Sequence, residues 1–209
     1  LWAAAAGYAL QVYCDFSGYS DMAMGLADLF GFHLMRNFDL PFLSANITEF
    51  WRRWHISLST WIRDYLFIPL GGSRGSRART VFNVLVTFTL CGLWHGANWN
   101  CVLWGFVTGV LLTIHMGFKA WANRRPALSA ALATRPGTAL RVAVTFTAFC
   151  LTMAVFRAQG LLDACVMVGR MLAPSAGAAL TRPAFGLYVT FGLVAICHYL
   201  GHHRRWLRL

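Results

Sequence analysis

Long apolar segments recur through this chain, and they constrain its fold more than any other feature. A helix needs about 20 largely apolar residues to cross the hydrocarbon core of a bilayer. Backbone polar groups inside lipid must bond within their own segment, which favours helices. The candidate spans cover residues 2–13 with a less apolar continuation to 32, then 81–97, 98–117, 139–156 and 185–200. We therefore predict an all-α, polytopic membrane helical bundle in which the spans 81–97 and 98–117 are antiparallel neighbours.

The composition favours a membrane protein over a nucleic-acid-binding one. Hydrophobic residues make up 58% of the chain and charged residues 12%, with a mean hydropathy of +0.55, whereas about a quarter of the residues in a soluble domain are charged. The net charge is +11 and the isoelectric point is near 10.2. A nucleic-acid-binding module would carry such a charge on a soluble basic face with interleaved aromatic residues. We expect the lipid bilayer, and no nucleic acid, as a partner.

Basic residues on a membrane protein mostly report its orientation, because they accumulate on the cytoplasmic side. With one crossing per candidate span, three basic clusters fall on the same side, and we expect that side to be cytoplasmic. The connection 157–183 then lies on the opposite side or dips into the membrane from it. The clusters are Arg74, Arg77 and Arg79; Lys119, Arg124, Arg125 and Arg135, in a basic Pro/Ala-rich loop; and Arg204, Arg205 and Arg208.

The segment 47–68 has the pattern of an amphipathic helix. Asn46 and Glu49 fit a capping box, and Pro69 followed by two glycines marks a stop. A helix with a charged stripe does not face lipid on all sides, so we predict one helix that lies in the interface or re-enters the membrane to line a polar cavity. The polar stripe consists of Arg52, His55, Ser59 and Arg63.

Two histidines, His55 and His95, each follow a tryptophan within strongly apolar sequence. A neutral imidazole can accept a proton near pH 7 and so serve as a general base. His55 can also be read as an interfacial histidine that only hydrogen-bonds a neighbour. His95 lies in a candidate span, where ionisable residues are costly and usually functional. Small-residue pairs flank it in sequence and would allow close helix packing around the imidazole: Gly92 with Gly96, and Gly105 with Gly109.

Carboxylates in the first third of the chain leave several roles open. Asp21 and Asp28 are seven residues apart, on one helical face, and could act in acid/base chemistry, bind a metal or neutralise arginines. We expect buried ion pairs with the arginines that are close in sequence. We expect no metal site, because no set of ligands shows the spacing of one. The nearby arginines are Arg36, Arg52, Arg53 and Arg63.

Four blocks of the sequence resemble a known family. They read YCDFSGYSDMAMGLADLFGF, ITEFWRRWHISLSTWIRDYLFIPLGG, GLWHGANWNCVLWG and MAVFRAQG, and run in consistent order from about Gln11 to Met171. They closely resemble the membrane-bound O-acyltransferases, in particular the bacterial polysaccharide branch typified by the membrane subunit of alginate O-acetylation. Members of that family are longer, so residues 1–209 resemble the C-terminal catalytic part of a single membrane domain, without its N-terminal spans. The segment 126–137 departs from the family pattern.

The resemblance implies a helical fold around a channel in the bacterial inner membrane. A cytoplasmic donor, acetyl-CoA, would meet an acceptor from the outer side there, and no cofactor would be bound permanently. His95 would be the catalytic residue and His55 the second polar residue of the active site. The acetyl group would pass to periplasmic SGNH-type acetyltransferases that modify an exopolysaccharide such as alginate, or another envelope polymer.

Further residues near the two histidines are expected to bind the substrate or the donor. Arg52 or His55 would polarise the carbonyl, and the cationic segment 74–79 would attract the phosphates of CoA. A transporter or flippase that relays protons through intramembrane histidines and aspartates is the competing function class. The candidate binding residues are Arg52, Ser59, Arg63, Asp64, Trp94 and Asn98, with Arg74, Arg77 and Arg79 for the phosphates of CoA.

Overall fold

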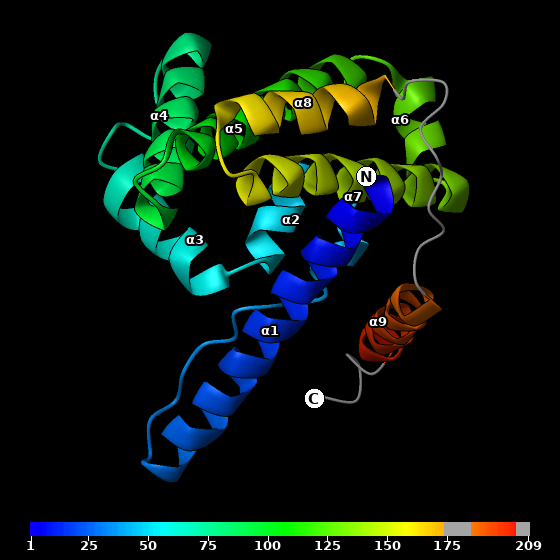
Figure 1. Cartoon of the computed structure of the whole chain (residues 1–209). Helices are drawn as coiled ribbons and strands as arrows, with labels where there is room; N and C mark the ends of the chain where they lie inside the picture. The colour runs from blue at the N-terminus through cyan, green and yellow to red at the C-terminus, as the bar shows by residue number, and fades with distance from the viewer. Residues whose placement is uncertain (174–184, 204–209) are drawn as a thin grey trace.

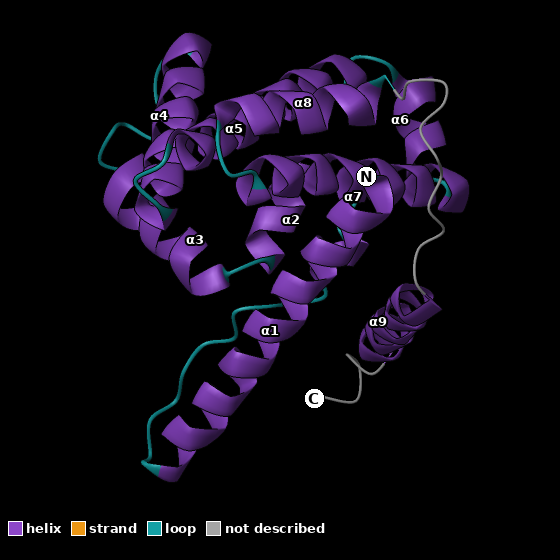
Figure 2. Cartoon of the chain, viewed as in Figure 1, coloured by secondary structure: helices purple, strands orange, loops and turns teal. Residues whose placement is uncertain are grey.

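The computed structural model describes residues 1–173 and 185–203, and every regular element within them is helical (Figures 1 and 2). The prediction of an all-α fold is therefore confirmed. The third basic cluster, Arg204, Arg205 and Arg208, lies outside the described residues. The elements are α1 (Trp2–Leu29), the 3-10 turn η1 (Pro41–Leu43), α2 (Ile47–Arg53), α3 (Ile56–Ile62), the π-helical turn η2 (Arg63–Phe67), α4 (Arg77–His95), α5 (Trp99–Ala122), α6 (Pro126–Ala133), α7 (Arg135–Arg157), α8 (Leu161–Leu172) and α9 (Phe185–His203).

Helices α4 and α5 pack backbone against backbone through glycines. A Cβ atom at Gly92 would collide with the carbonyl oxygen of Cys101, and one at Gly105 with the carbonyl oxygen of Phe88. A Cβ at Gly109 would lie 3.2 Å from the Cα of Leu85. The residue numbers on α4 fall as those on α5 rise, so the two helices are antiparallel neighbours, as predicted. Small residues let helices approach this closely.

Helix α8 lies beside α5 and α7 (Figure 1). The indole Nε1 of Trp2 donates a hydrogen bond of 3.1 Å to the carbonyl oxygen of Met171, which ties the start of α1 to the end of α8. The side chain of Asn100 on α5 donates to the carbonyl oxygen of Ala158 at 2.8 Å, just after the end of α7. These two bonds hold the end of α8, and the connection between α7 and α8, against the rest of the bundle.

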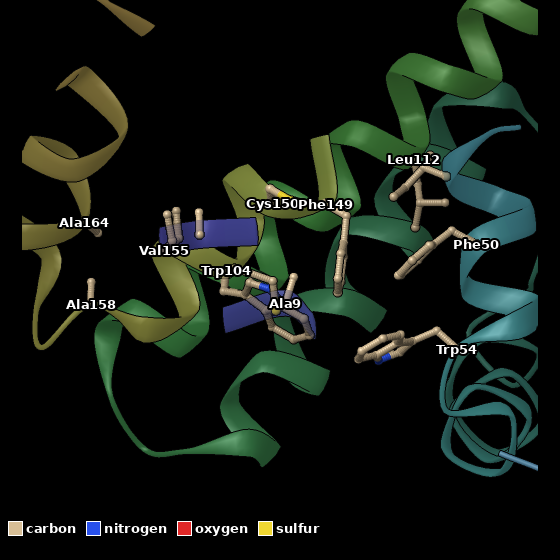
Figure 3. Packing of buried hydrophobic residues seen from close by; sticks show 14 of the residues in the cluster. Ala9, Phe50, Trp54, Trp104, Leu112, Phe149, Cys150, Val155, Ala158 and Ala164 are labelled. Atoms are coloured by element: carbon tan, nitrogen blue, oxygen red, sulfur yellow. The ribbon is translucent and has the colours of Figure 1, made fainter. Parts of the chain in front are cut away.

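An aromatic cluster fills the space between α2 and α7. Phe50 and Trp54 extend toward Phe149 of α7 in Figure 3, with ring centroids 4.3 Å and 5.0 Å from that of Phe149. All three side chains are buried. Aromatic rings bury large apolar areas and gain further from edge-to-face contacts, so this cluster fixes α2 against the bundle.

Two described helices, α5 and α7, are long and apolar enough to cross a membrane. Helices also form at the other three expected spans. In α1 and α4 their polar residues keep the mean hydropathy below that of α5 and α7, and in α9 the apolar stretch is the shorter segment Tyr188–His198.

The predicted single helix over 47–68 is wrong. The chain forms α2, leaves helical geometry at Trp54 and His55, and then continues through α3 into the π-helical turn η2. The capping box at the start is present, because the side chain of Asn46 accepts the backbone N–H of Glu49 at 2.8 Å. The break occurs because His55 adopts a left-handed backbone conformation, with φ of 44° and ψ of 57°.

Two further expectations need correction. The segment expected as a Pro/Ala-rich loop contains the helix α6, and α7 begins within the same segment. The expected ion pairs of Asp21 and Asp28 with arginines do not form among the described residues: both carboxylates are exposed, and Asp28 contacts Nδ1 of His33 at 3.2 Å. The arginines near them pair locally instead, Arg53 with Glu49 at 2.6 Å and Arg63 with Asp64 at 2.7 Å.

Candidate active site

A cavity of about 750 Å³ lies among α1, α2, α3, α4, α5 and α7, and both histidines line it. The structure therefore brings together the two residues that the sequence singled out, although they are far apart along the chain. Four other predicted site residues line the same cavity: Arg52, Ser59, Arg63 and Trp94. The remaining predictions, Asp64, Asn98, Arg74, Arg77 and Arg79, lie outside its wall.

His95 is the last residue of α4, where the helix gives way to the extended backbone of Gly96. Its ring packs edge-on against Trp104 of α5, with centroids 5.2 Å apart, and against Phe156 of α7, at 5.5 Å. The adjacent Trp94 ring lies at 4.9 Å. The side chain of His95 is exposed in the chain and lines the cavity. Aromatic rings thus fix the imidazole in place while leaving it open to a bound molecule.

His55 lies at the break between α2 and α3, on a second part of the cavity wall. Its ring packs edge-on against Phe16 of α1, with centroids 4.5 Å apart. Burial and, to a smaller extent, the neighbouring His95 lower the pKa of His55 to about 4. His55 is consequently neutral at pH 7, so one ring nitrogen can donate a hydrogen bond and the other can accept one.

Four buried polar atoms on residues of the cavity wall have no hydrogen-bond partner within the described residues. Two of them are indole N–H groups, which can only donate, and they belong to Trp51 and Trp104. Leaving a buried polar atom unpaired costs about 1–3 kcal/mol. Such atoms therefore suit a site whose occupant supplies carbonyl or hydroxyl oxygens. The four atoms are Nε1 of Trp51, Nδ1 of His55, Oγ1 of Thr87 and Nε1 of Trp104.

The cationic groups at the cavity differ in how they are paired. Arg63 donates to both carboxylate oxygens of Asp64, at 2.7 and 3.1 Å, so Asp64 neutralises Arg63 and does not itself reach the cavity. Arg52 is exposed and has no ion-pair partner within residues 1–173 and 185–203. Arg52 is therefore the cavity's arginine that can bind an anionic group of a ligand.

Arg74 lies in the exposed loop that precedes α4, and Arg77 and Arg79 lie, also exposed, in the first turn of α4. Asn83 fastens this loop by donating to the carbonyl oxygen of Gly72 at 3.0 Å. Gly71, Gly72 and Gly75 have positive φ angles of 108°, 56° and 93°, which side-chain-bearing residues rarely adopt. The loop is adjacent to Phe67, which does line the cavity. The three arginines thus lie near the cavity but do not line it.

Sequence reasoning missed several residues that build the site. Trp51 and Trp104 supply the unpaired donors, and Phe156 supports His95. Asn37 hydrogen-bonds the backbone next to His55 from a distant part of the chain. Phe156 and the tryptophans fall inside the quoted sequence blocks, but an apolar or aromatic residue in a membrane segment gives no signal of its own. Asn37 has no local signal, because its partners are 17 to 20 residues away.

The chain matches the membrane-bound O-acyltransferase family over residues 1–157, a range that contains His55, His95 and most of the cavity wall. That match extends over most of the sequence. The chain belongs to the membrane-bound O-acyltransferase family. The resemblance on which the site residues were first chosen is therefore correct at the level of the family.

The names of several relatives within the membrane-bound O-acyltransferases describe enzymes that acetylate a polysaccharide or peptidoglycan. The chain is 55% identical over 118 residues to a probable alginate O-acetylase AlgI of Azotobacter vinelandii, which is 56% of this chain and 24% of that protein. It is 48% identical over 160 residues to a probable alginate O-acetylase AlgI of Pseudomonas aeruginosa (77% and 29%). A peptidoglycan O-acetyltransferase of Helicobacter pylori is 42% identical over 118 residues (56% and 22%). The aligned part thus spans less than a third of each relative.

Proposed function

We propose that this protein is a membrane O-acyltransferase that transfers acetyl groups from a cytoplasmic donor, acetyl-CoA, for the O-acetylation of an exopolysaccharide such as alginate. The observation that carries the proposal is the convergence of His55, His95 and unpaired hydrogen-bond donors on one cavity. The names of the relatives support the acetyl group and the polysaccharide acceptor. The peptidoglycan relative makes another envelope polymer the alternative acceptor.

His95 acts as the general base in this proposal. Its imidazole takes the proton of the attacking hydroxyl as the oxygen bonds to the thioester carbonyl carbon. When the tetrahedral intermediate collapses, the carbon–sulfur bond breaks, and the proton passes from His95 to the leaving thiolate. One ester and one free thiol result, so atoms and charge balance. The exposed ring of His95, held by Trp104 and Phe156, suits this repeated uptake and release of a proton.

The negative charge that develops on the carbonyl oxygen needs a donor. The Trp104 N–H, buried, unpaired and next to His95, is in a position to donate to that oxygen. The neutral His55 can donate or accept a further hydrogen bond, and Arg52 adds a positive charge. Such preorganised donors are often the largest single contribution to acyl transfer, and the apolar wall excludes water that would hydrolyse the thioester.

CoA phosphates would bind outside the cavity wall. Arg74 in the loop before α4, and Arg77 and Arg79 in the first turn of α4, are exposed beside the cavity, so they would attract a polyanion without entering the reaction centre. This arrangement supports a donor that inserts only its thioester end, and it predicts no permanently bound cofactor. The proposed setting is the bacterial inner membrane, with periplasmic SGNH-type acetyltransferases as the partners that receive the acetyl group.

The test is a transfer assay with the full-length protein in proteoliposomes. Radiolabelled acetyl-CoA is supplied on one side, and both thiol release and label on the acceptor, or on a periplasmic partner, are measured. We expect label transfer with the native protein and none with His95→Ala at equal protein abundance. Equal transfer by both proteins would remove the proposed role of His95, and no thiol release from acetyl-CoA by the native protein would exclude it as the donor.

A further inference from the structure

The geometry points to Asn37 as the residue that positions His55 for the reaction. The inference rests on the proposed function, since it concerns how the second histidine of that site is held. It starts from the break between α2 and α3, where His55 has a left-handed backbone conformation. A histidine in this region is uncommon, and the surrounding structure must hold it there.

The backbone after His55 is not capped locally. The first N–H groups of a helix lack partners within the helix, and the side chain of His55, at the position before α3, accepts no capping hydrogen bond. The residues just before the break cannot supply the missing cap either, because residues 52–54 are Arg, Arg and Trp and include no asparagine. The first turn of α3 must be satisfied from elsewhere in the chain.

Asn37 supplies these bonds from the segment that follows α1. Its backbone carbonyl accepts the N–H of Ile56 at 3.0 Å, and its side-chain Oδ1 accepts the N–H of Ser57 at 3.1 Å. The same Oδ1 accepts the hydroxyl of Ser57 at 2.6 Å. The side-chain Nδ2 donates to the hydroxyl of Ser20 on α1 at 3.4 Å. One residue thus caps α3 and joins it to α1.

The neighbouring backbone adds one more hydrogen bond to those of Asn37, and we call this set of bonds the clamp. The N–H of Asp39 donates to the carbonyl oxygen of Arg53 at 2.9 Å, so the segment around Asn37 bonds on both sides of the break. Phe16, whose ring packs against His55, lies one helical turn from Ser20 on α1. Asn37 therefore fixes both the backbone of His55 and the helix that carries its ring contact.

Loss of the Asn37 side chain should lower the rate of the proposed reaction. A misplacement of about 1 Å in an active site can lower the rate by about 100-fold. Without Asn37 the break can relax toward continuous helix, which redirects the imidazole. Asn37 does not itself line the cavity and reaches it only through the backbone of Ile56, next to His55, so it acts through that backbone and is a positioning residue.

The test compares Asn37→Leu, which has a similar size but no acceptor, with Asn37→Asp, which keeps Oδ1 as an acceptor. In the full-length protein we expect Asn37→Leu to lower kcat by up to about 100-fold with a smaller change in KM. Asn37→Asp should keep at least about tenfold more activity than Asn37→Leu, because its oxygen still accepts the bonds from Ser57. Equal loss from Leu and Asp overturns the inference.

A double-mutant cycle separates positioning from a general structural role. If Asn37 acts through His55, then Asn37→Leu should cause no further loss in a His55→Ala background. The matched control is Asn46→Leu, which also removes an asparagine cap but on α2, through the 2.8 Å bond to Glu49. Its effect should multiply with that of His55→Ala. If the loss from Asn37→Leu also multiplies with that from His55→Ala, then Asn37 supports folding alone and does not act through His55.

A second readout does not depend on turnover. Deuterium uptake of a peptide covering residues 55–62 should rise in Asn37→Leu, because the amide of Ser57 loses its side-chain partner while only the backbone bond of Ile56 remains, and should stay near native in Asn37→Asp. Unchanged uptake in Asn37→Leu contradicts the clamp. If the native protein transfers no acetyl group but the uptake changes as expected, the proposed function fails while the clamp stands.

Discussion

At the scale of single residues, the proposed mechanism assigns proton transfer and charge stabilisation to different side chains. His95 is open to the cavity and fixed by aromatic rings, whereas His55 is half-buried and held by backbone geometry. The indole of Trp104 lies next to His95 and has an unpaired N–H. Each of these differences leads to a separate substitution experiment.

The first prediction concerns His95 as the general base. His95→Gln keeps a similar size and hydrogen-bonding capacity but cannot accept a proton at neutral pH. Since general-base catalysis contributes about 10²–10⁴-fold, we expect His95→Gln to be nearly as inactive as His95→Ala, with unchanged abundance in the membrane. The measurement is kcat for acetyl transfer. A fully active His95→Gln protein would contradict the assignment.

The second prediction uses the lowered pKa of His55. A histidine is neutral above its pKa, and burial lowers that of His55 to about 4, so its charge does not change between pH 5 and 8. An acidic limb of kcat/KM within this range would therefore belong to another group, His95 in our proposal. His55→Gln should lower the rate but keep that limb at the same pH. Loss or displacement of the limb in His55→Gln would show that His55 titrates there.

The third prediction concerns Trp104 as a carbonyl donor. Trp104→Phe keeps an aromatic ring but removes the N–H, and loss of one such donor costs about 10²–10³-fold in kcat. The matched control is Trp121→Phe on the same helix, since Trp121 is half-exposed, stacks on Arg125 and lies outside the cavity. Replacement of Trp104 by 3-benzothienylalanine, which substitutes sulfur for the N–H at the same shape, should match Trp104→Phe. Native kcat in that protein would exclude the donor role.

At the scale of helices, the hairpin of α4 and α5 depends on direct backbone contact. Gly92 and Gly105 meet carbonyl oxygens of the opposite helix, so an added methyl group has no flexible neighbour to displace. Because α4 ends in His95 and α5 carries Trp104, the separation of these helices sets the distance between the proposed base and the proposed donor.

The fourth prediction tests this packing. Gly105→Ala should lower the melting temperature of the full-length protein in detergent and its yield, because the helices must separate to admit the methyl group. Gly117→Ala is the control on the same helix, since nothing lies within 4 Å of the added Cβ, and alanine is favoured over glycine in a helix by about 0.5–1 kcal/mol. A melting temperature for Gly105→Ala equal to or above that of Gly117→Ala would contradict the close contact.

The elements also show how far the sequence alone could predict the structure. The glycine spacing and the short connection at 96–98 were sufficient for the α4–α5 hairpin, because both signals are local. The break at His55 was missed, since the periodicity of 47–68 is continuous and contains neither glycine nor proline. The backbone just after the break donates its hydrogen bonds to Asn37, which is distant in sequence, and no local pattern contains these bonds.

The same distinction applies to the site. The residues of the polar stripe, His95 and Trp94 were identified by their chemistry and by the family resemblance, and all six share one cavity. The predicted ion pairs between arginines and Asp21 or Asp28 were wrong, because proximity in sequence does not fix the direction of a long arginine side chain. Unpaired indole donors become visible only when the tertiary packing is known.

At the scale of the whole molecule, the orientation in the membrane follows from α5, α6 and α7. Helices α5 and α7 can each cross a bilayer, and the basic segment around α6 connects them. We therefore expect the two ends of α7 to lie on opposite sides of the membrane, with 123–137 on the cytoplasmic side because of its arginines. With α4 as a further crossing, as the sequence predicts, Arg74 before it and Arg77 and Arg79 in its first turn fall on the same side, which would place these arginines where a cytoplasmic polyanionic donor arrives.

The fifth prediction tests this orientation with reporter fusions in the full-length protein. Fusions after Arg79 and within 123–137 should report the cytoplasm, and a fusion near 175 should report the periplasm. The pair on either side of α7 is the sharpest comparison, because it depends on one helix and one crossing. Substituting Arg124 and Arg125 together with glutamine should weaken the orientation signal, since positive charge next to a span retains that end in the cytoplasm. A periplasmic signal from 123–137 in the unsubstituted protein would mean that the number of crossings before α7 is wrong. It would also exclude the proposed role of Arg74, Arg77 and Arg79 in binding the phosphates of CoA.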